Sequence, residues 1–200
     1  MKPILVLYAT REGHTRRIAE HIAATIRARG YSADVLDAAD LPSGFSMDAY
    51  EAAVIAASVH REKHEKEMVS FVKRFREELE SMRAVFLSVS LSEAGAEDAA
   101  ATPERRALAA AEVRKMIDAF LKETGWHPSK VRGVAGALSY TKYNFLVRFV
   151  MKRIAKAQGA STDTSRDHEL TDWEALDHIA DEVVPHGGMP KDSRPDPELR

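Results

Sequence analysis

The chain has 200 residues, a length that suits one domain with insertions better than two full domains. Hydrophobic residues make up 44% of it, enough for a core, and a formal charge of −2 argues against a dedicated nucleic-acid binder. The absence of cysteine excludes disulfides, cysteine-ligated metals and a thiol nucleophile, and fits a reducing compartment. We see no secretory signal and no run near the ~18 apolar residues of a membrane span. We therefore expect a cytoplasmic protein, either soluble or peripheral on a membrane.

Short apolar runs alternate with amphipathic stretches along the chain. The runs predict five buried strands, over residues 4–9, 33–36, 52–57, 84–89 and 131–138. Apolar residues at helical spacing predict helices over 14–29, 65–80, 103–125 and 171–184, with loops over 37–46 and 90–102. This order predicts an α/β fold whose mostly parallel sheet is covered by helices on both faces. We assign residues 1–184 to a single domain and expect a disordered tail over 185–200.

Ligands of such sheets bind at the carboxyl ends of the strands, in the loops that follow them. The first loop comprises Thr10, Arg11, Glu12, Gly13, His14 and Thr15. It follows a strand and opens a helix, where backbone N–H groups attract phosphate and a glycine permits close approach. The spacings of Walker and dinucleotide-binding loops are absent, and the pattern instead resembles the T-x-x-G-x-T loop of flavodoxins, which binds the monophosphate of FMN. A plain turn before a capped helix is the alternative interpretation.

Two further strands end in small residues at the same edge. The second loop comprises Ala57, Ser58, Val59 and His60, and the third comprises Ser88, Val89, Ser90 and Leu91. In flavodoxin-like proteins these two loops bracket the isoalloxazine ring. Small side chains also simply end strands, but the position of all three loops at the ligand-binding edge of one predicted sheet favours a shared ligand.

Two histidines, His60 and His64, have the spacing of helical metal ligands. The residues between them resemble a solvated loop, and no third ligand is evident. We therefore predict no metal site, and expect His60 to line a flavin or substrate cavity. His60 is also a weak candidate for proton removal, although no general base is identifiable.

Residues 140–158 form the least usual stretch, YTKYNFLVRFVMKRIAKAQ, which combines a helical apolar stripe with positive charge. The candidate residues for contact with substrate or membrane are Tyr140, Lys142, Tyr143, Arg148, Lys152, Arg153 and Lys156. Basic amphipathic helices with aromatic residues are typical of anionic membrane surfaces and of acidic ligands. The alternative is a helix that packs on its own sheet and exposes a basic face.

These segments together resemble the flavodoxin-type, menaquinone-dependent protoporphyrinogen IX oxidases. The resemblance covers roughly residues 2–184 and is carried by ILVLYATREGHTRRIA, VIAASVHREKH, VFLSVSL, GWHPSKVRGVAGALSYTKYNFLVRFVMKRIAK and STDTSRDHELTDWE. It implies a long-chain flavodoxin-like fold, a doubly wound sheet of five parallel strands with an extra basic helical insert over about 139–168. It also adds Gly136, Ala137 and Leu138 to the FMN-binding residues.

The same resemblance implies an activity. It implies the six-electron oxidation of protoporphyrinogen IX to protoporphyrin IX in haem synthesis, with electrons passing through FMN to menaquinone or ubiquinone. The basic helix would meet the propionates of the substrate or hold the enzyme on the inner face of the cell membrane. The flavin carries the redox chemistry, so no side-chain nucleophile is expected.

Two other functions remain open. An FMN oxidoreductase or electron carrier of the same fold would serve another partner, and the acidic stretch SEAGAEDAAATPE after the fourth strand suits a less anionic substrate. A flavin-free interaction module would use the basic helix for recruitment alone. The sequence leaves the oligomeric state open, including a homo-oligomer.

Overall fold

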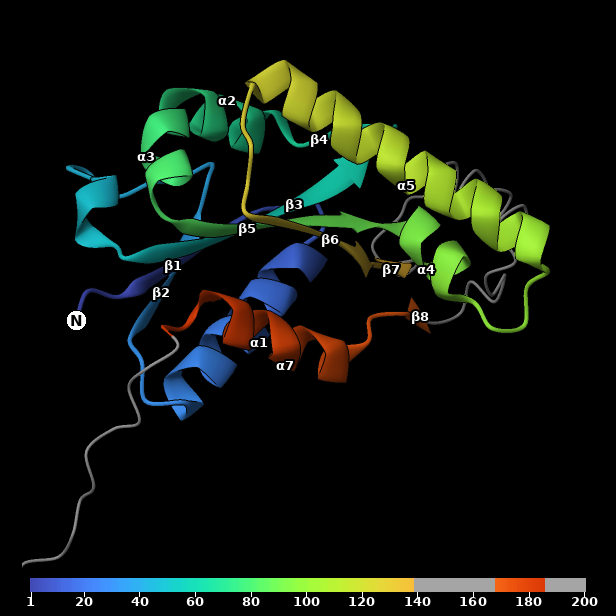
Figure 1. Ribbon diagram of the computed structural model, residues 1–200, viewed down its shortest axis with the longest axis horizontal. Coiled ribbons are helices and arrows are strands. Elements are labelled where there is room, and N and C mark those ends of the chain that lie inside the picture. Colours follow the sequence, from blue (N-terminus) through green and yellow to red (C-terminus); the bar gives the residue numbers. More distant parts are fainter. Residues whose placement is uncertain (139–167, 186–200) are drawn as a thin grey trace, which may run out of the picture.

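The computed structural model describes residues 1–138 and 168–185, in which helices cover a parallel sheet (Figure 1). The parallel strands are β1 (Ile4–Ala9), β2 (Ala33–Asp37), β3 (Ala52–His60), β5 (Arg83–Ser90) and β6 (Lys130–Ala135). They pair in the order β2-β1-β3-β5-β6. All six residues of β1 are buried, because a neighbour strand lies on each side and helices cover both faces.

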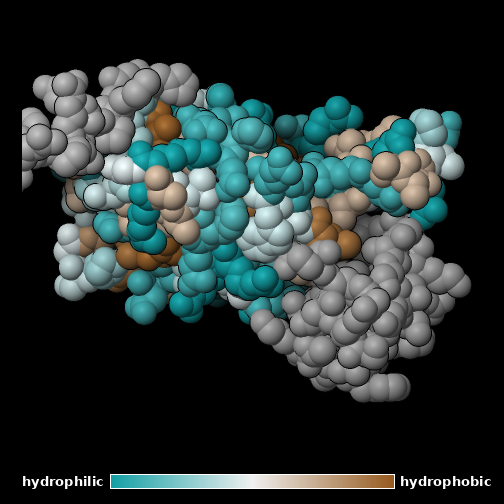
Figure 2. All heavy atoms as spheres, turned by 90° about the horizontal axis from the view of Figure 1, so that it is seen from below, coloured by the Kyte–Doolittle hydropathy of each residue, from teal (hydrophilic) through white to brown (hydrophobic). Residues whose placement is uncertain are grey.

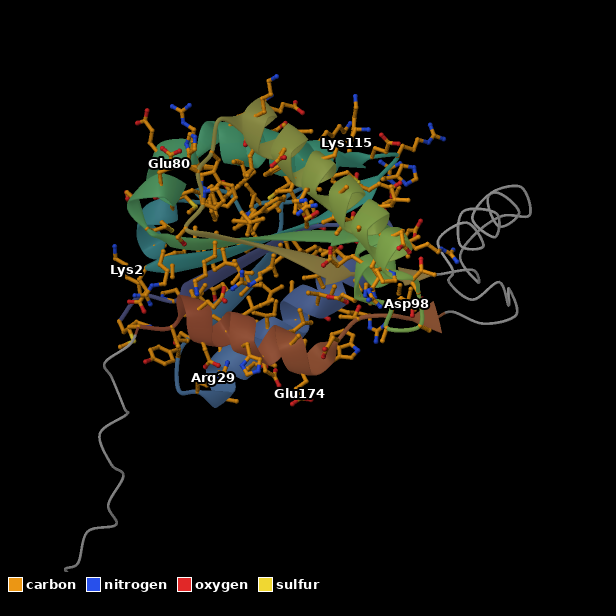
Figure 3. The ribbon with its side chains drawn as sticks, turned by 45° about the vertical axis from the view of Figure 1, so that its right-hand side comes forward. Lys2, Arg29, Glu80, Asp98, Lys115 and Glu174 are labelled. Carbon is orange, nitrogen blue, oxygen red and sulfur yellow. The ribbon has the colours of Figure 1, made fainter. Side chains whose placement is uncertain are left out.

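Helices lie on both faces of the sheet, as the sequence predicts. One face carries α1 (His14–Ala28) and α7 (Trp173–Val183), and the other carries α2 (Lys66–Arg74), α3 (Arg76–Ser81) and α5 (Pro103–Thr124) (Figure 1). The short 3-10 helix η1 (Met47–Ala49) precedes β3. Charged side chains such as Lys115 on α5 and Glu174 on α7 project outward from the two helical layers (Figure 3). The face seen in Figure 2 is accordingly mostly hydrophilic, with separate small hydrophobic patches.

Alternating side chains of the strands fill two cores. On β1, Ile4 and Val6 pack toward α1 and α7, whereas Leu5 and Leu7 pack toward α2 and α5. Fully burying one such side chain stabilises the fold by roughly 1.5–3 kcal/mol. The two cores therefore fix the strands, and with them the loops at the carboxyl ends.

The structure corrects two predictions for segments between strands. The helix predicted over 65–80 is broken at Phe75, which leaves helical geometry and buries its ring against Phe45 and Phe71. The loop predicted over 90–102 contains a helix, α4 (Leu91–Glu97). The Ser90 hydroxyl accepts a hydrogen bond from the Glu93 N–H at its start. A Ser-x-x-Glu capping signal was therefore present in the sequence and was missed.

Two strand predictions are also corrected. The third strand runs on to His60 and turns back into β4 (Lys63–His64), which pairs with it antiparallel. The strand predicted over 131–138 ends at Ala135, and after Gly136 the short strand β7 (Ala137–Leu138) pairs with β8 (His168–Glu169) in a separate ribbon. Most of the predicted insert over 139–168 and of the predicted tail over 185–200 lies outside the described residues.

Candidate functional site

The loop between β1 and α1 has the geometry of an anion site. Gly13 has a φ of 89°, a left-handed conformation that favours glycine, and its N–H donates to the Thr10 hydroxyl over 3.0 Å. No side chain caps α1, and its first turn contains no acidic residue. The Thr15 hydroxyl is buried and has no hydrogen-bond partner among the described residues. The first turn of α1 thus offers free N–H groups and an unpartnered hydroxyl to an anion, and no carboxylate in that turn competes for them.

A cavity of about 110 Å³ lies at the carboxyl ends of the strands, where the predicted loops converge. Its lining includes Thr10, Arg11, Glu12, His14, Thr15, Ser58, Val59, His60, Val89, Ser90, Leu91, Gly136 and Ala137. These residues come from four loops and were all predicted to bind one ligand. Their convergence follows from the parallel sheet, which brings the ends of β1, β3, β5 and β6 to one edge.

Four of the predicted residues do not line this cavity. Gly13 provides the left-handed backbone conformation of the first loop, and Ala57 is fully buried within β3. Ser88 is also buried, and its hydroxyl is bonded to His64. Leu138 belongs to β7, which pairs with β8. The seven basic and aromatic residues predicted between Tyr140 and Lys156 lie outside the described residues.

The sequence analysis missed Glu65, which also lines the cavity. This residue is only 8% exposed, and its Oε2 accepts a hydrogen bond from Arg11 Nη2 over 3.1 Å. Its Oε1 accepts from the Ser58 hydroxyl over 3.4 Å. Glu65 therefore ties the first loop to the end of β3. The interpretation of residues 61–63 as a solvated loop, and of Glu65 as the first residue of a helix, gave no reason to place this carboxylate in the cavity.

A second missed residue, Thr171, connects the first loop to the end of β6. Its hydroxyl donates to the Ala135 carbonyl over 2.7 Å, so its one proton is already used. His14 Nε2 lies 2.7 Å from the same oxygen and must therefore donate to it. This chain of bonds holds the start of α1 against the strand end that precedes Gly136.

The two histidines of the hairpin formed by β3 and β4 have separate roles. His60 lines the cavity, whereas the buried His64 is hydrogen-bonded to the Ser88 hydroxyl over 2.9 Å and packs against the stacked rings of Phe86 and Phe120. Burial lowers the pKa of His64 to about 4, so the ring is neutral near pH 7. Both residues lie on strands, so their separation of four positions does not place them on one helical face.

Two carboxylates on α4 lie beside the same edge of the sheet. Glu93 packs over Gly133, where a side chain would collide with its carboxylate. Burial raises the pKa of Glu93, and burial together with the charges of Glu93 and Asp172 raises the pKa of Glu97. Both carboxylates line a separate hollow with Asp172, and α4 reaches the cavity only through its first residue, Leu91.

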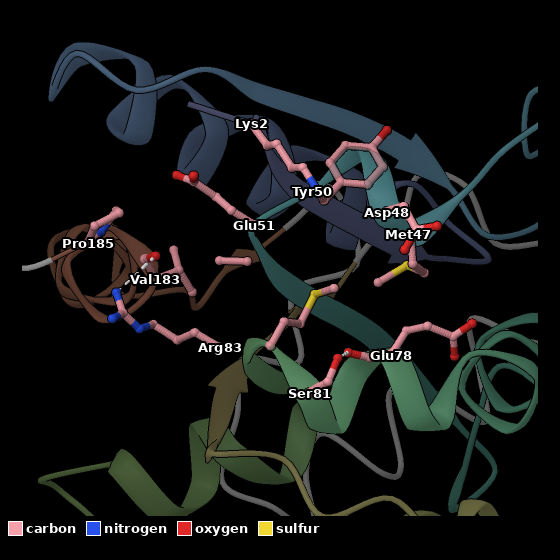
Figure 4. Close-up of a pocket in the computed structure, with 12 residues that line it drawn as sticks. Lys2, Met47, Asp48, Tyr50, Glu51, Glu78, Ser81, Arg83, Val183 and Pro185 are labelled. Carbon is pink, nitrogen blue, oxygen red and sulfur yellow. Dashed lines mark hydrogen bonds between the residues drawn. The ribbon is translucent and has the colours of Figure 1, made fainter.

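A larger depression, of about 500 Å³, lies at the opposite, amino-terminal ends of the strands (Figure 4). Its lining includes Lys2, Met47, Glu51, Ser81, Arg83 and Val183. Ser81 and Val183 are the last residues of α3 and α7, and the C-terminal end of a helix carries partial negative charge. This depression therefore lacks the helix N–H groups that the start of α1 presents at the other end, and its positive charge comes from Lys2 and Arg83.

The described ranges 1–138 and 168–185 contain neither a membrane-spanning helix nor a cluster of metal ligands. No helix there is long and apolar enough to cross a bilayer. No group of three or more histidine, aspartate or glutamate side chains there has the arrangement of a metal site.

Comparison with known proteins places these features in a family. The flavodoxin domain family matches residues 5–165. Protoporphyrinogen IX dehydrogenase (quinone) of Escherichia coli (strain K12) is 32% identical over 180 residues, which cover 90% of this chain and 93% of the relative. The Leishmania major protein of the same name is 32% identical over 181 residues, which cover 90% of this chain and 74% of the relative.

A solved structure confirms the predicted flavodoxin-like fold. A short-chain flavodoxin associated with a non-canonical PDU bacterial microcompartment superposes with a TM-score of 0.51 at 14% identity. The superposition covers 92% of this chain and 97% of that flavodoxin, and at this identity it shows the fold alone. Together with the sequence matches, it shows that the chain belongs to the flavodoxin domain family, as a member of its protoporphyrinogen IX dehydrogenase (quinone) enzymes.

Proposed function

We propose that the cavity at the carboxyl edge binds FMN and that the protein oxidises protoporphyrinogen IX, with a quinone as electron acceptor. The observation that carries the first step is the buried, unpartnered Thr15 hydroxyl at the uncapped start of α1. A phosphate monoester supplies the acceptor oxygens that this hydroxyl and the neighbouring N–H groups lack. The substrate and acceptor rest on the names of relatives that match over 90% of the chain.

The residues of the cavity suit the two parts of FMN. The first loop would hold the phosphate through Thr10, Thr15 and the N–H groups that begin α1. The ends of β3, β5 and β6 offer backbone and small side chains at Ser58, Ser90 and Gly136 for the ring. When bound, FMN supplies the redox chemistry, and the protein positions and tunes it. The bond from His14 to Thr171 would keep the two halves of this site in register.

The decisive experiment is a fluorescence assay on the full chain reconstituted with FMN. Protoporphyrinogen IX and menadione are added, and porphyrin fluorescence is followed against a protein-free autoxidation control. We expect fluorescence to rise faster than in the control. A rate equal to that of autoxidation, with FMN bound, would overturn the proposed substrate.

A second candidate is an FMN oxidoreductase or electron carrier with a different partner. It is favoured by α4, which begins at the cavity with Leu91 and contains Glu93 and Glu97, because negative charge on this helix would oppose a dianionic porphyrinogen. Charge removal at Glu97 distinguishes the two functions. If porphyrinogen is the substrate, Glu97→Gln should lower its KM, and if another partner is used, porphyrinogen turnover stays at background in both proteins.

Membrane contact is a separate part of the proposal and rests on the sequence of residues 140–158. Vesicles rich in anionic lipid should retain the protein in a flotation assay, in a salt-sensitive manner. Reversing charge at Lys152 and Arg153 should release it. The matched control is reversal at Lys73 and Lys115, whose ammonium groups are each paired with a glutamate on the described surface.

A further inference from the structure

The Arg11–Glu65 ion pair joins two segments that line the cavity and are 54 residues apart in the chain. Arg11 belongs to the loop after β1, and Glu65 precedes α2 as its N-terminal capping residue. Both line the cavity proposed to bind FMN. The pair therefore adjoins any ligand there, and its charges act on that ligand directly.

The two partners differ strongly in their exposure to solvent. The Glu65 side chain is 8% exposed, and the Ser58 hydroxyl donates to its second oxygen. The Arg11 side chain is 55% exposed, and one of its nitrogens meets Glu65. Water and salt screen the charge of Arg11 more effectively than that of Glu65. Within the described chain, Arg11 is the one lysine or arginine that lines this cavity.

We propose that this ion pair sets the reduction potential of the bound flavin: Glu65 lowers the potential, and Arg11 offsets that effect. This inference rests on the proposed function. Reduction adds negative charge to a flavin, and a buried carboxylate nearby opposes the added charge. A guanidinium on the same carboxylate removes most of that opposition. The protein thereby holds its potential by a balance between two residues rather than by either one alone.

Three variants test the balance in the full chain reconstituted with FMN. Redox titration with reference dyes gives the midpoint potential of bound FMN, and quenching of FMN fluorescence gives its Kd. We expect Glu65→Gln to shift the potential upward and Arg11→Gln to shift it downward. The midpoint potential of the double variant should lie between those of the single variants, near that of the unmodified protein. Because oxidised FMN is already anionic, Arg11→Gln should also raise Kd about tenfold and Glu65→Gln should lower it.

Matched controls separate charge from structure. Glu62 belongs to the same hairpin, but its carboxylate is 76% exposed, pairs with Lys115 and does not line the cavity. Glu62→Gln should leave the potential unchanged. Arg11→Lys keeps the positive charge and should restore most of the potential lost in Arg11→Gln. Thermal unfolding of each apoprotein shows whether the variant retains the fold.

The outcomes distinguish this inference from the proposed function. If folded single variants shift the potential in the same direction, or by no more than Glu62→Gln does, the ion pair does not set the potential and the inference fails alone. If the unmodified protein binds no FMN, the proposed function and the inference both fail. If FMN binds and the potentials shift as stated while porphyrinogen is not oxidised, the inference stands and only the proposed substrate fails.

Discussion

The two ends of the parallel sheet carry cavities of opposite character. At the carboxyl end, a cavity of about 110 Å³ faces the uncapped start of α1, whereas a depression of about 500 Å³ at the amino end faces the last residues of α3 and α7. In a doubly wound sheet, the helices that follow the strands begin near one edge and end near the other. We therefore expect helix polarity, more than volume, to decide which end binds an anionic ligand.

The largest expected effect comes from Gly13→Asp at the carboxyl end. An aspartate at a φ of 89° is strained, and its charge would oppose the phosphate at close range. We expect Kd for FMN to rise about 1,000-fold, roughly 4 kcal/mol, and the purified protein to be colourless. Fluorescence quenching measures the Kd.

Gly44→Asp is the control for this prediction. Gly44 has a φ of 76°, and no atom lies within 4 Å of the position that its Cβ would occupy. It therefore carries a comparable backbone strain in a loop remote from the cavity. Equal FMN affinity in the Gly13→Asp and unmodified proteins would mean that the carboxyl end does not hold a phosphate.

The buried histidine beneath the carboxyl-end cavity gives the next largest effect. The pKa of His64 is about 4 in the folded protein against about 6.5 when exposed, so the unfolded chain binds this proton first as pH falls. The free energy of unfolding should fall by up to about 3 kcal/mol between pH 6.5 and pH 4. Below pH 4, protonation of His64 should cause no further loss. Urea unfolding at pH 7, 5.5 and 4.5 measures the loss. In His64→Gln the loss over this range should be smaller by that amount, and identical pH profiles in the two proteins would contradict the assignment.

Sequence patterns were sufficient for the sheet and for the place of the cavity. Apolar runs located β1, β3 and β5, and the parallel arrangement then required their following loops to share an edge. Sequence patterns did not predict contacts between distant segments of the chain. The Arg11–Glu65 pair and the bond from His14 to Thr171 join residues 54 and 157 positions apart, and no local pattern encodes such a distance.

Boundaries failed where tertiary packing overrides local preference. Phe75 has the right spacing for a continuous helix, but its ring packs in a cluster with Phe45 and Phe71, and the helix breaks there. Residues Arg61 and Glu62 form the turn of the β3–β4 hairpin with φ values of 50° and 62°. That conformation favours glycine or asparagine, so an arginine and a glutamate at these positions do not indicate a hairpin.

A smaller effect, with opposite signs in two assays, is expected from Thr15→Val. The buried hydroxyl has no partner in the described protein, so its removal should leave the apoprotein equally or more stable. FMN affinity should fall about tenfold, roughly 1.5 kcal/mol, because a hydrogen bond to phosphate is lost.

Thr25→Val on the same helix is the matched control. Its hydroxyl donates to Asp177, so that variant should lose stability and keep its FMN affinity. Unchanged FMN affinity in Thr15→Val would show that the hydroxyl does not contact the ligand.

The smallest effect is expected at the amino end, from Arg83→Met. Arg83 Nη1 donates to the Val184 carbonyl over 2.6 Å and so caps the C-terminal end of α7. Loss of this bond should cost about 1 kcal/mol of stability, measured by urea unfolding. The Kd for FMN should not change, because Arg83 begins β5 and Ser90, at the cavity, ends it. A loss of FMN affinity as large as that in Thr15→Val would mean that the larger depression takes part in binding, and that helix polarity does not separate the two ends.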